Sequence, residues 1–143
     1  MKKIIALLIL LATILVLLVI KFYDYKAEYS KIKGRNVQYE SYYQKELSGI
    51  DVATIVNRAV NDNETNNIKK DSKGLYTDNQ ADSIKVEVKI TDNDKTYSME
   101  TLYNGGMANF VKYYGNIEFE CTKIEYHSKT KKIKYMLFEQ KSD

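Results

Sequence analysis

Two residues of this chain could form a nucleophile and its base, because Cys121 is the only cysteine and His127 the only histidine. A thiol needs a neighbouring group such as an imidazole to act as a nucleophile. Cys121, however, alternates with Ile117 and Phe119 in the pattern of a half-buried strand, which predicts a core position for the thiol. Six further residues of extended chain would put His127 about 20 Å away. We therefore expect no catalytic pair and no enzyme, and a lone cysteine also excludes an internal disulfide.

Two acidic segments, residues 62–64 (Asp-Asn-Glu) and 92–94 (Asp-Asn-Asp), carry the oxygen ligands that Ca²⁺ prefers. Neither has the glycine and the terminal glutamate at the offsets of a calcium-binding loop. Both compositions are typical of turns and helix caps. The sequence therefore predicts no metal site and no cofactor.

A local basic cluster consists of Lys129, Lys131 and Lys132, followed by Lys134. It could contact anionic lipid headgroups, teichoic-type polymers or an acidic protein partner. It could equally be the solvated tip of a hairpin, where lysines discourage aggregation. Beyond the first twenty residues, 20 basic side chains face 19 acidic ones, so we expect no nucleic-acid partner.

An uncharged run extends from Ile4 to Ile20, with Thr13 as its only polar side chain. A helix of this length spans about 26 Å, close to the ~30 Å hydrocarbon core of a bilayer. A secretory signal peptide begins in the same way, but lysine and aromatic residues follow this run where signal peptidase needs small ones. The sequence therefore predicts an uncleaved signal-anchor over residues 1–21, with the lipid bilayer as partner of the apolar run.

The orientation of this anchor depends on its flanking charges. Lys2 and Lys3 favour a cytoplasmic N-terminus, whereas the basic residues between positions 21 and 35 favour the opposite topology. A very short basic tail before an apolar run is the usual build of a signal-anchor. We predict a single-pass protein of the cell membrane with its N-terminus in the cytoplasm and its domain outside.

Aromatic and apolar residues continue beyond the anchor at a spacing of three and four, typical of a heptad seam. The seam residues are Phe22, Tyr25, Tyr29, Ile32, Asn36, Tyr39 and Tyr43. They predict a juxtamembrane helix over residues 22–47. The seam could pack against the chain's own domain or form a coiled coil with other copies. Because the helix is about as long as a small domain is wide, we expect Tyr25, Tyr29 and Ile32 to be exposed for contact with another chain, and Tyr39 and Tyr43 to be buried.

Residues 48–143 alternate between helical and strand periodicities, which predicts a small α+β domain. Ser48 and Asp51 have the spacing of a capping box and begin an amphipathic helix that we expect to end near residues 61–63. Residues 61–83 are polar and unpatterned. They predict either a surface loop held by Leu75 and Tyr76 or partial disorder.

The remaining patterns predict an antiparallel sheet of three to four strands. Alternating segments lie at 84–90, 117–126 and 133–138, and residues 96–103 fit either a strand or the start of a helix. The last segment is apolar on both faces, which suits a central strand. A short inserted helix is expected at 107–114, and a change of parity near Thr122 predicts a β-bulge.

The order of apolar helix, heptad-like extension and sheet resembles the layout of type IV pilins and pseudopilins. The prepilin motif is missing, because Lys3 precedes the run and position 8 is leucine instead of a glutamate five residues into the run. The stretch at 49–58, GIDVATIVNR, also resembles segments of uncharacterised single-span membrane-anchored proteins of low-GC Gram-positive bacteria, a resemblance that implies no activity.

Two functional hypotheses follow. The first is a non-catalytic, membrane-anchored extracytoplasmic domain that binds another membrane or envelope protein, or a second copy of itself, as an accessory subunit of a cell-envelope assembly. Its contact residues would be Tyr25, Tyr29 and Ile32 with Lys129, Lys131 and Lys132. The alternative is a membrane-tethered sensory or small-ligand-binding module.

Overall fold

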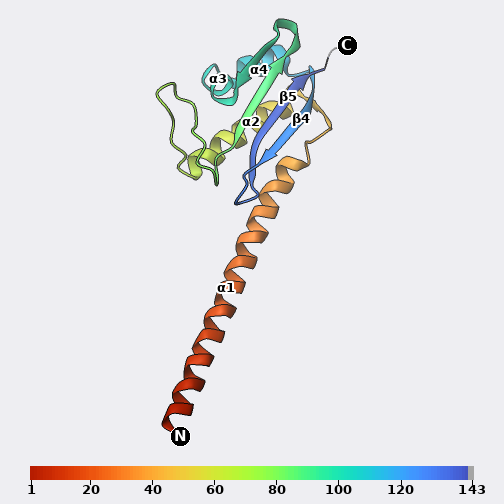
Figure 1. Ribbon diagram of the computed structural model, residues 1–143. Coiled ribbons are helices and arrows are strands. Elements are labelled where there is room, and N and C mark those ends of the chain that lie inside the picture. The colour runs from red at the N-terminus through yellow and green to blue at the C-terminus, as the bar shows by residue number, and fades with distance from the viewer. Residues whose placement is uncertain (142–143) are drawn as a thin grey trace. The chain divides into compact units, whose positions relative to one another are not determined.

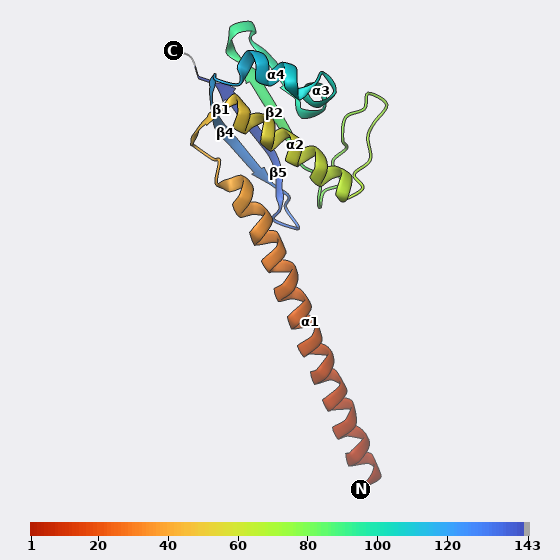
Figure 2. The same ribbon diagram turned by 180° about the vertical axis from the view of Figure 1, so that it is seen from behind.

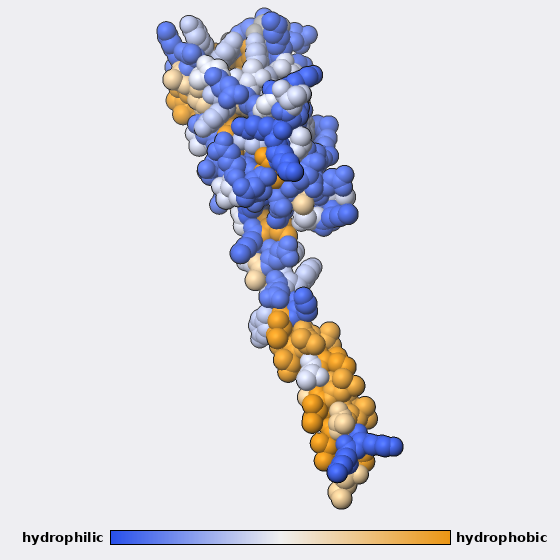
Figure 3. Space-filling view, turned by 90° about the vertical axis from the view of Figure 1, so that its left-hand side faces the viewer, coloured by the Kyte–Doolittle hydropathy of each residue, from blue (hydrophilic) through white to orange (hydrophobic). Residues whose placement is uncertain are grey.

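The computed structural model describes residues 1–141, apart from the side chain of Asn93. The chain divides into two compact units, Met1–Gly34 and Arg35–Asp143. Helix α1 (Lys2–Glu40) makes up most of the first unit and the beginning of the second (Figure 1). It is long and apolar enough to cross a membrane, and none of its most apolar stretch is buried. In the space-filling view the apolar side chains of the first unit form a continuous surface (Figure 3).

Helix α1 ends at Glu40, so the predicted helix over residues 22–47 is wrong in its last part. Gln44 has a φ of +54°, a left-handed conformation that an α-helix does not continue through. Leu47 lies instead in strand β1 (Glu46–Ser48), where it pairs with Phe119 and is buried. Pairing with a distant strand therefore outweighs continuation of the helix.

The last two tyrosines of the aromatic seam, Tyr39 and Tyr43, differ in burial. Tyr39 is fully buried, as expected, and its hydroxyl donates a hydrogen bond to Asp62 Oδ2 at 2.8 Å. Tyr43 lies beyond the helix and is 41% exposed, so the prediction that it would be buried is wrong. Its backbone forms an isolated bridge with Cys121, which draws the chain onto the sheet and away from the helical course.

Helix α2 (Gly49–Thr65) begins with the predicted capping box. The Asp51 N–H donates to Ser48 Oγ at 3.2 Å, and the Ser48 N–H donates to Asp51 Oδ2 at 2.9 Å. Gly49 is needed at this start, because a Cβ there would lie 1.9 Å from the carbonyl oxygen of Tyr114. The helix ends at Thr65, two residues past its predicted end near residues 61–63, and keeps Asn63 buried on its apolar face.

Five strands form one mixed sheet in the order β1-β4-β5-β2-β3. The strands after β1 are β2 (Lys85–Ile90), β3 (Lys95–Ser98), β4 (Glu118–Tyr126) and β5 (Ile133–Gln140). All neighbours are antiparallel except β2 and β5, which are parallel. The α+β class is confirmed. The predicted sheet is antiparallel with three to four strands. The observed sheet has in addition the short edge strand β1 and a parallel pair, β2 with β5, and both features come from pairing between segments far apart in the sequence.

Two finer features of the strands follow their sequence patterns. The register of β4 against β5 shifts between Cys121 and Lys123, which confirms the predicted bulge. Strand β5 is central, between β4 and β2, and its residues Met136 and Phe138 are fully buried. The segment that is apolar on both faces is thus the middle strand of the five, as its pattern predicted.

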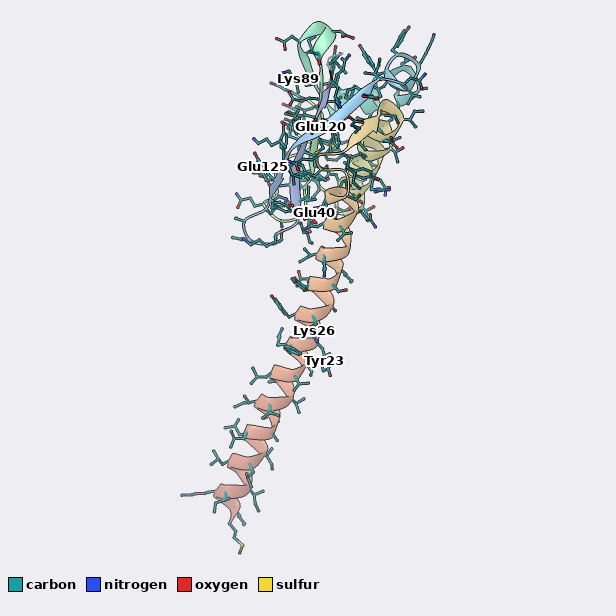
Figure 4. All side chains as sticks on the ribbon, turned by 90° about the vertical axis from the view of Figure 1, so that its right-hand side faces the viewer. Tyr23, Lys26, Glu40, Lys89, Glu120 and Glu125 are labelled. Atoms are coloured by element: carbon teal, nitrogen blue, oxygen red, sulfur yellow. The ribbon has the colours of Figure 1, made fainter. Side chains whose placement is uncertain are left out.

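Helices cover one face of the sheet. A 3-10 turn (Thr91–Asn93) joins β2 to β3, and α3 (Met99–Asn104) and α4 (Met107–Tyr114) follow before β4. These two helices lie with α2 on the same side of the sheet (Figures 1 and 2). The core between the layers contains Val52, Ile55, Val56, Val86, Val88, Phe110, Phe119, Met136 and Phe138. Lys89, Glu120 and Glu125 lie on the side of the sheet away from α2 (Figure 4).

Candidate functional site

The predicted contact residues of α1 form an aromatic surface. Tyr25 is 68% exposed and Tyr29 is 58% exposed, and their rings stack with centroids 6.4 Å apart. Ile32, one turn further on, is partly buried, so the prediction that it would be exposed is wrong for this residue. Phe22 packs edge-on against Tyr23 at 6.2 Å. Rings spaced one turn apart on one helix thus present a continuous apolar strip to whatever surrounds the first unit.

The predicted lysine cluster separates into two kinds of side chain. Lys129 and Lys131 are exposed, in the turn between β4 and β5. Lys132 forms an ion pair with Asp82 and is partly buried. Only Lys129 and Lys131 therefore remain as exposed ammonium groups, and the cluster is smaller than its spacing in the sequence predicted.

Most of the unpatterned segment 61–83 lies between α2 and β2, where residues 66–84 form a surface loop with a defined path. Asp71 Oδ1 accepts the N–H groups of Lys73 and Leu75 at 2.8 and 3.0 Å. Asn79 Oδ1 accepts three successive N–H groups, those of residues 81, 82 and 83. Of the two predicted alternatives, the structure has the surface loop, and side-chain oxygens in place of a strand partner bind its backbone.

Five buried polar residues hold this loop and the β4–β5 turn, and we call them the buried polar set. Its members are Asn36, Asn63, Ser83, Glu100 and His127. Asn63 makes both hydrogen bonds of a peptide group to Ile84: its Nδ2 donates to the carbonyl at 2.8 Å, and its Oδ1 accepts the N–H at 2.9 Å. Burying an amide is costly unless it is paired, so these contacts indicate dedicated positions.

His127 fixes the end of the loop. The residue is 2% exposed, and its Nε2 donates to the carbonyl oxygen of Ser83 at 2.7 Å. Its Nδ1 lies 3.8 Å from Asp78 Oδ1, beyond hydrogen-bond distance. Asp78 also accepts the Ser83 hydroxyl and pairs with Lys134 at 3.2 Å. The imidazole is thus bound to a backbone carbonyl and does not face a nucleophile.

Asn36 and Glu100 complete the set. Asn36 Nδ2 donates to the Lys131 carbonyl at 2.7 Å, and its Oδ1 accepts the Ile133 N–H at 3.0 Å. Glu100 Oε1 accepts the Tyr76 N–H at 2.9 Å. The end of α1, the start of α3 and the turn before β5 are therefore all connected through buried polar contacts.

Cys121 is fully buried, as its alternating pattern predicted. Burial raises the pKa of its thiol to about 12, which keeps it protonated near neutral pH. The acidic segments form structural contacts: Asp62 accepts the Tyr39 hydroxyl, and Asp92 Oδ1 accepts Gln140 Nε2 at 3.2 Å. Within residues 1–141, His, Cys, Asp and Glu side chains form no group of three that could hold a metal ion.

A small hollow of about 180 Å³ lies between the loop and the polar face of the sheet. Its walls include Lys85, Lys123 and Lys134 with Tyr76 and Tyr135. The lysines are engaged in ion pairs, Lys85 with Glu87 at 2.6 Å and Lys123 with Glu125 at 2.6 Å.

A second hollow, about 300 Å³, is more apolar and lies beside α3 and α4. Its lining includes Ile90, Tyr97, Leu102, Phe110, Tyr113 and Tyr114. Phe110 also packs against Tyr114, with ring centroids 5.5 Å apart and the rings tilted by 31°, so part of this wall is packed core.

The sequence patterns did not reveal the buried polar set as a group. Asn63 does carry a signal, because it continues the i, i+3, i+4, i+7 positions of the apolar face of α2 and is polar. Asn36 carries another as the one polar residue of the aromatic seam. Glu100 and Ser83 stand in polar surroundings, where an alternating or helical period gives no information about burial.

No protein-family model matches this chain, and no curated protein or solved structure matches it either.

Proposed function

We propose that this protein is a membrane-anchored, non-catalytic interaction domain located outside the cytoplasm, which serves as an accessory subunit of a cell-envelope assembly. The exposed surface of α1 supports this most. Fourteen large aliphatic side chains between Ile4 and Ile20 are each 46–65% exposed. Soluble monomers rarely leave so large a continuous apolar surface in water, and insertion into a bilayer removes it.

Cell fractionation tests the anchor. The protein should sediment with membranes, resist extraction at alkaline pH and dissolve in detergent. A variant with Leu11→Lys and Leu15→Lys should become soluble, because each lysine at the centre of a spanning helix costs about 3 kcal/mol. The matched control, Leu11→Ile with Leu15→Ile, should stay in the membrane. Recovery of the unaltered chain from the soluble fraction would contradict the anchor.

Protease protection tests the proposed orientation. Protease added to intact protoplasts should digest the chain after Lys21 and leave a short membrane-protected fragment. The loop at residues 66–84 is on the surface and should be cut first. Complete protection until lysis would place the domain in the cytoplasm and would mean that the basic residues after the apolar run set the topology.

The aromatic strip at Tyr25 and Tyr29 is the proposed contact with another chain in the membrane or envelope, either a different protein or a second copy of this one. Lys129 and Lys131 provide a second, electrostatic contact for an acidic partner surface. Extraction in mild detergent followed by identification of co-purified proteins tests this. Tyr25→Ala with Tyr29→Ala should lose the partner. Tyr23→Ala is the control, because Tyr23 is as exposed as Tyr25, at 68%, but lies off the seam.

A small-ligand-binding module is the second candidate, favoured by the hollow beneath the 66–84 loop. Its volume of about 180 Å³ is below the ~300–1,000 Å³ typical of ligand pockets, which is why we rank it second. Isothermal titration of the detergent-solubilised protein with small amino-acid and carboxylate probes tests it. Binding that Lys123→Ala and Lys134→Ala each weaken would favour this candidate, and the absence of binding at millimolar concentrations would exclude it for these probes.

A further inference from the structure

Tyr29 lies too far along α1 for lipid to cover it. Nine residues separate it from Ile20, which is about 14 Å of helix. The headgroup layer outside the hydrocarbon core is only about 5–8 Å thick on each side. Tyr29 is nevertheless 58% exposed and stacked on Tyr25. The first unit therefore presents aromatic surface in water, beyond the reach of the bilayer that would bury the apolar run.

This surface continues a heptad spacing that begins inside the apolar run. We call the continuous set of positions the pairing stripe, and it consists of Leu8, Leu11, Leu15, Leu18, Phe22, Tyr25, Tyr29 and Ile32. Four leucines at alternating intervals of three and four lead directly into the aromatic part. A stripe with a period of 3.5 residues is the pattern that two helices use to pack along a shared seam.

We propose that a second copy of this chain packs in parallel against α1 along the pairing stripe. The proposal rests on the proposed function in one respect: anchoring in a single membrane forces both copies to be parallel. It goes beyond that function because it identifies the partner of Tyr25 and Tyr29 as the same tyrosines of another copy.

The charges beside the stripe are complementary to themselves in this arrangement. In a parallel pair, the residue just before the first seam position of each heptad, here Phe22 or Tyr29, faces the residue five positions later in the partner helix. Glu28 then faces Lys33 of the second copy, and the symmetry of the pair makes this contact twice. Lys21 faces Lys26 in the same way, a like-charge contact at the level of the lipid phosphates, whose negative charge offsets it.

The stripe ends where the compact unit of residues 35–143 begins. Asn36 and Tyr39 continue the same spacing, but both are buried within that unit. Tyr39 is bound to Asp62, and Asn36 is bound to the turn before β5. Pairing between copies is therefore limited to residues 8–32, and the two chains separate beyond Gly34.

Cysteine cross-linking in membranes tests the geometry. In a Cys121→Ala background, single cysteines at Tyr25, Tyr29 and Ile32 should form disulfide-linked dimers efficiently on oxidation. Cysteines at Ala27 and Ser30, on other faces of the helix, should give at least about fivefold less dimer. Equal cross-linking at all five positions, or none at the seam positions, would overturn the proposal.

A charge exchange tests the pairing independently of the tyrosines. Glu28→Lys and Lys33→Glu should each reduce the cross-linked dimer by roughly two- to thirtyfold, the range expected when two exposed ion pairs are lost. Co-expression of the two variants should restore dimer as a mixed pair. Failure of the mixed pair to recover would refute the parallel register. Fractionation of the same cells distinguishes this outcome from loss of the anchor. If the protein is in the membrane fraction but forms no cross-linked dimer, the pairing proposal is refuted and the proposed membrane anchor is not.

Discussion

Asn63 offers the sharpest test of the buried polar set, because a single side chain there binds both polar groups of one residue. Its amide is fully buried and pairs with the N–H and the carbonyl of Ile84, 21 residues away. Asn63→Ala removes the hydrogen-bond partners of both the Ile84 N–H and the Ile84 carbonyl, while Ile84 itself stays buried in the core. The change therefore strands two buried backbone groups without altering the surface.

The expected magnitude follows from these two groups. Each unsatisfied buried peptide group costs about 1–3 kcal/mol. Alanine is a better helix former than asparagine, which offsets about 0.5 kcal/mol. The free energy of unfolding should thus fall by about 2–5 kcal/mol, a large share of the ~5–15 kcal/mol expected for a single domain. Asn61→Ala is the matched control, because Asn61 is exposed on the same helix and should change stability by less than about 0.5 kcal/mol.

The assay is urea unfolding of the full-length protein in mild detergent, followed by near-ultraviolet circular dichroism of its 13 tyrosines. Amide exchange of Ile84 should accelerate in the variant even under native conditions, because its N–H loses its acceptor. Equal midpoints for Asn63→Ala and Asn61→Ala would refute the role that we assign to the buried polar set.

Three further predictions concern single sites. Cys121, whose thiol pKa is raised to about 12 by burial, should resist thiol reagents at neutral pH, and Cys121→Ala should cost about 1–3 kcal/mol; rapid labelling of the native protein would contradict its burial. Gly49→Ala should lower the melting temperature markedly, because its Cβ would meet the Tyr114 carbonyl oxygen at 1.9 Å; an unchanged melting temperature would mean that the start of α2 shifts freely. A hydrogen bond from the Gln80 N–H, helped by a nearby lysine, holds the pKa of Asp78 below its usual range, so Asp78 stabilises the fold above about pH 4 and this contribution is lost as the pH falls through the lower folded-state pKa. Asp78→Asn should therefore flatten the acid limb of the pH–stability curve measured by urea unfolding, and an identical curve would contradict this contribution.

Local patterns were sufficient for the elements that bury a face with a clear period. The apolar face of α2, the capping box at Ser48 and the bulge after Cys121 all follow from residues within one turn or a few strand positions. The α+β class follows from the same signals, because a period of 3.6 or of 2 directly reflects which side chains enter the core. Elements of this kind need no knowledge of their partners.

Other elements depend on partners that are distant in the sequence. Leu47 fits both a helix and a strand, and only Phe119, its partner in β4, decides between them. The parallel pairing of β2 with β5 likewise joins segments about 50 residues apart, such as Val86 and Met136. His127 and Ser83 lie 44 residues apart and are joined by one hydrogen bond. A local pattern cannot encode such contacts, because their free energy arises only when both segments are in place.

Asn36 shows how a polar exception in an apolar stripe carries information. Asparagine at a seam position of a coiled coil fixes the register between two helices, because its amide must find a partner. Here that partner is within the chain: the Lys131 carbonyl and the Ile133 N–H, at 2.7 and 3.0 Å. Leucine at this position would leave the buried Ile133 N–H and the part-buried Lys131 carbonyl without this partner and would cost stability in spite of its greater hydrophobicity. The asparagine therefore sets where the end of α1 meets β5, and it marks the point on the seam at which packing within the chain begins.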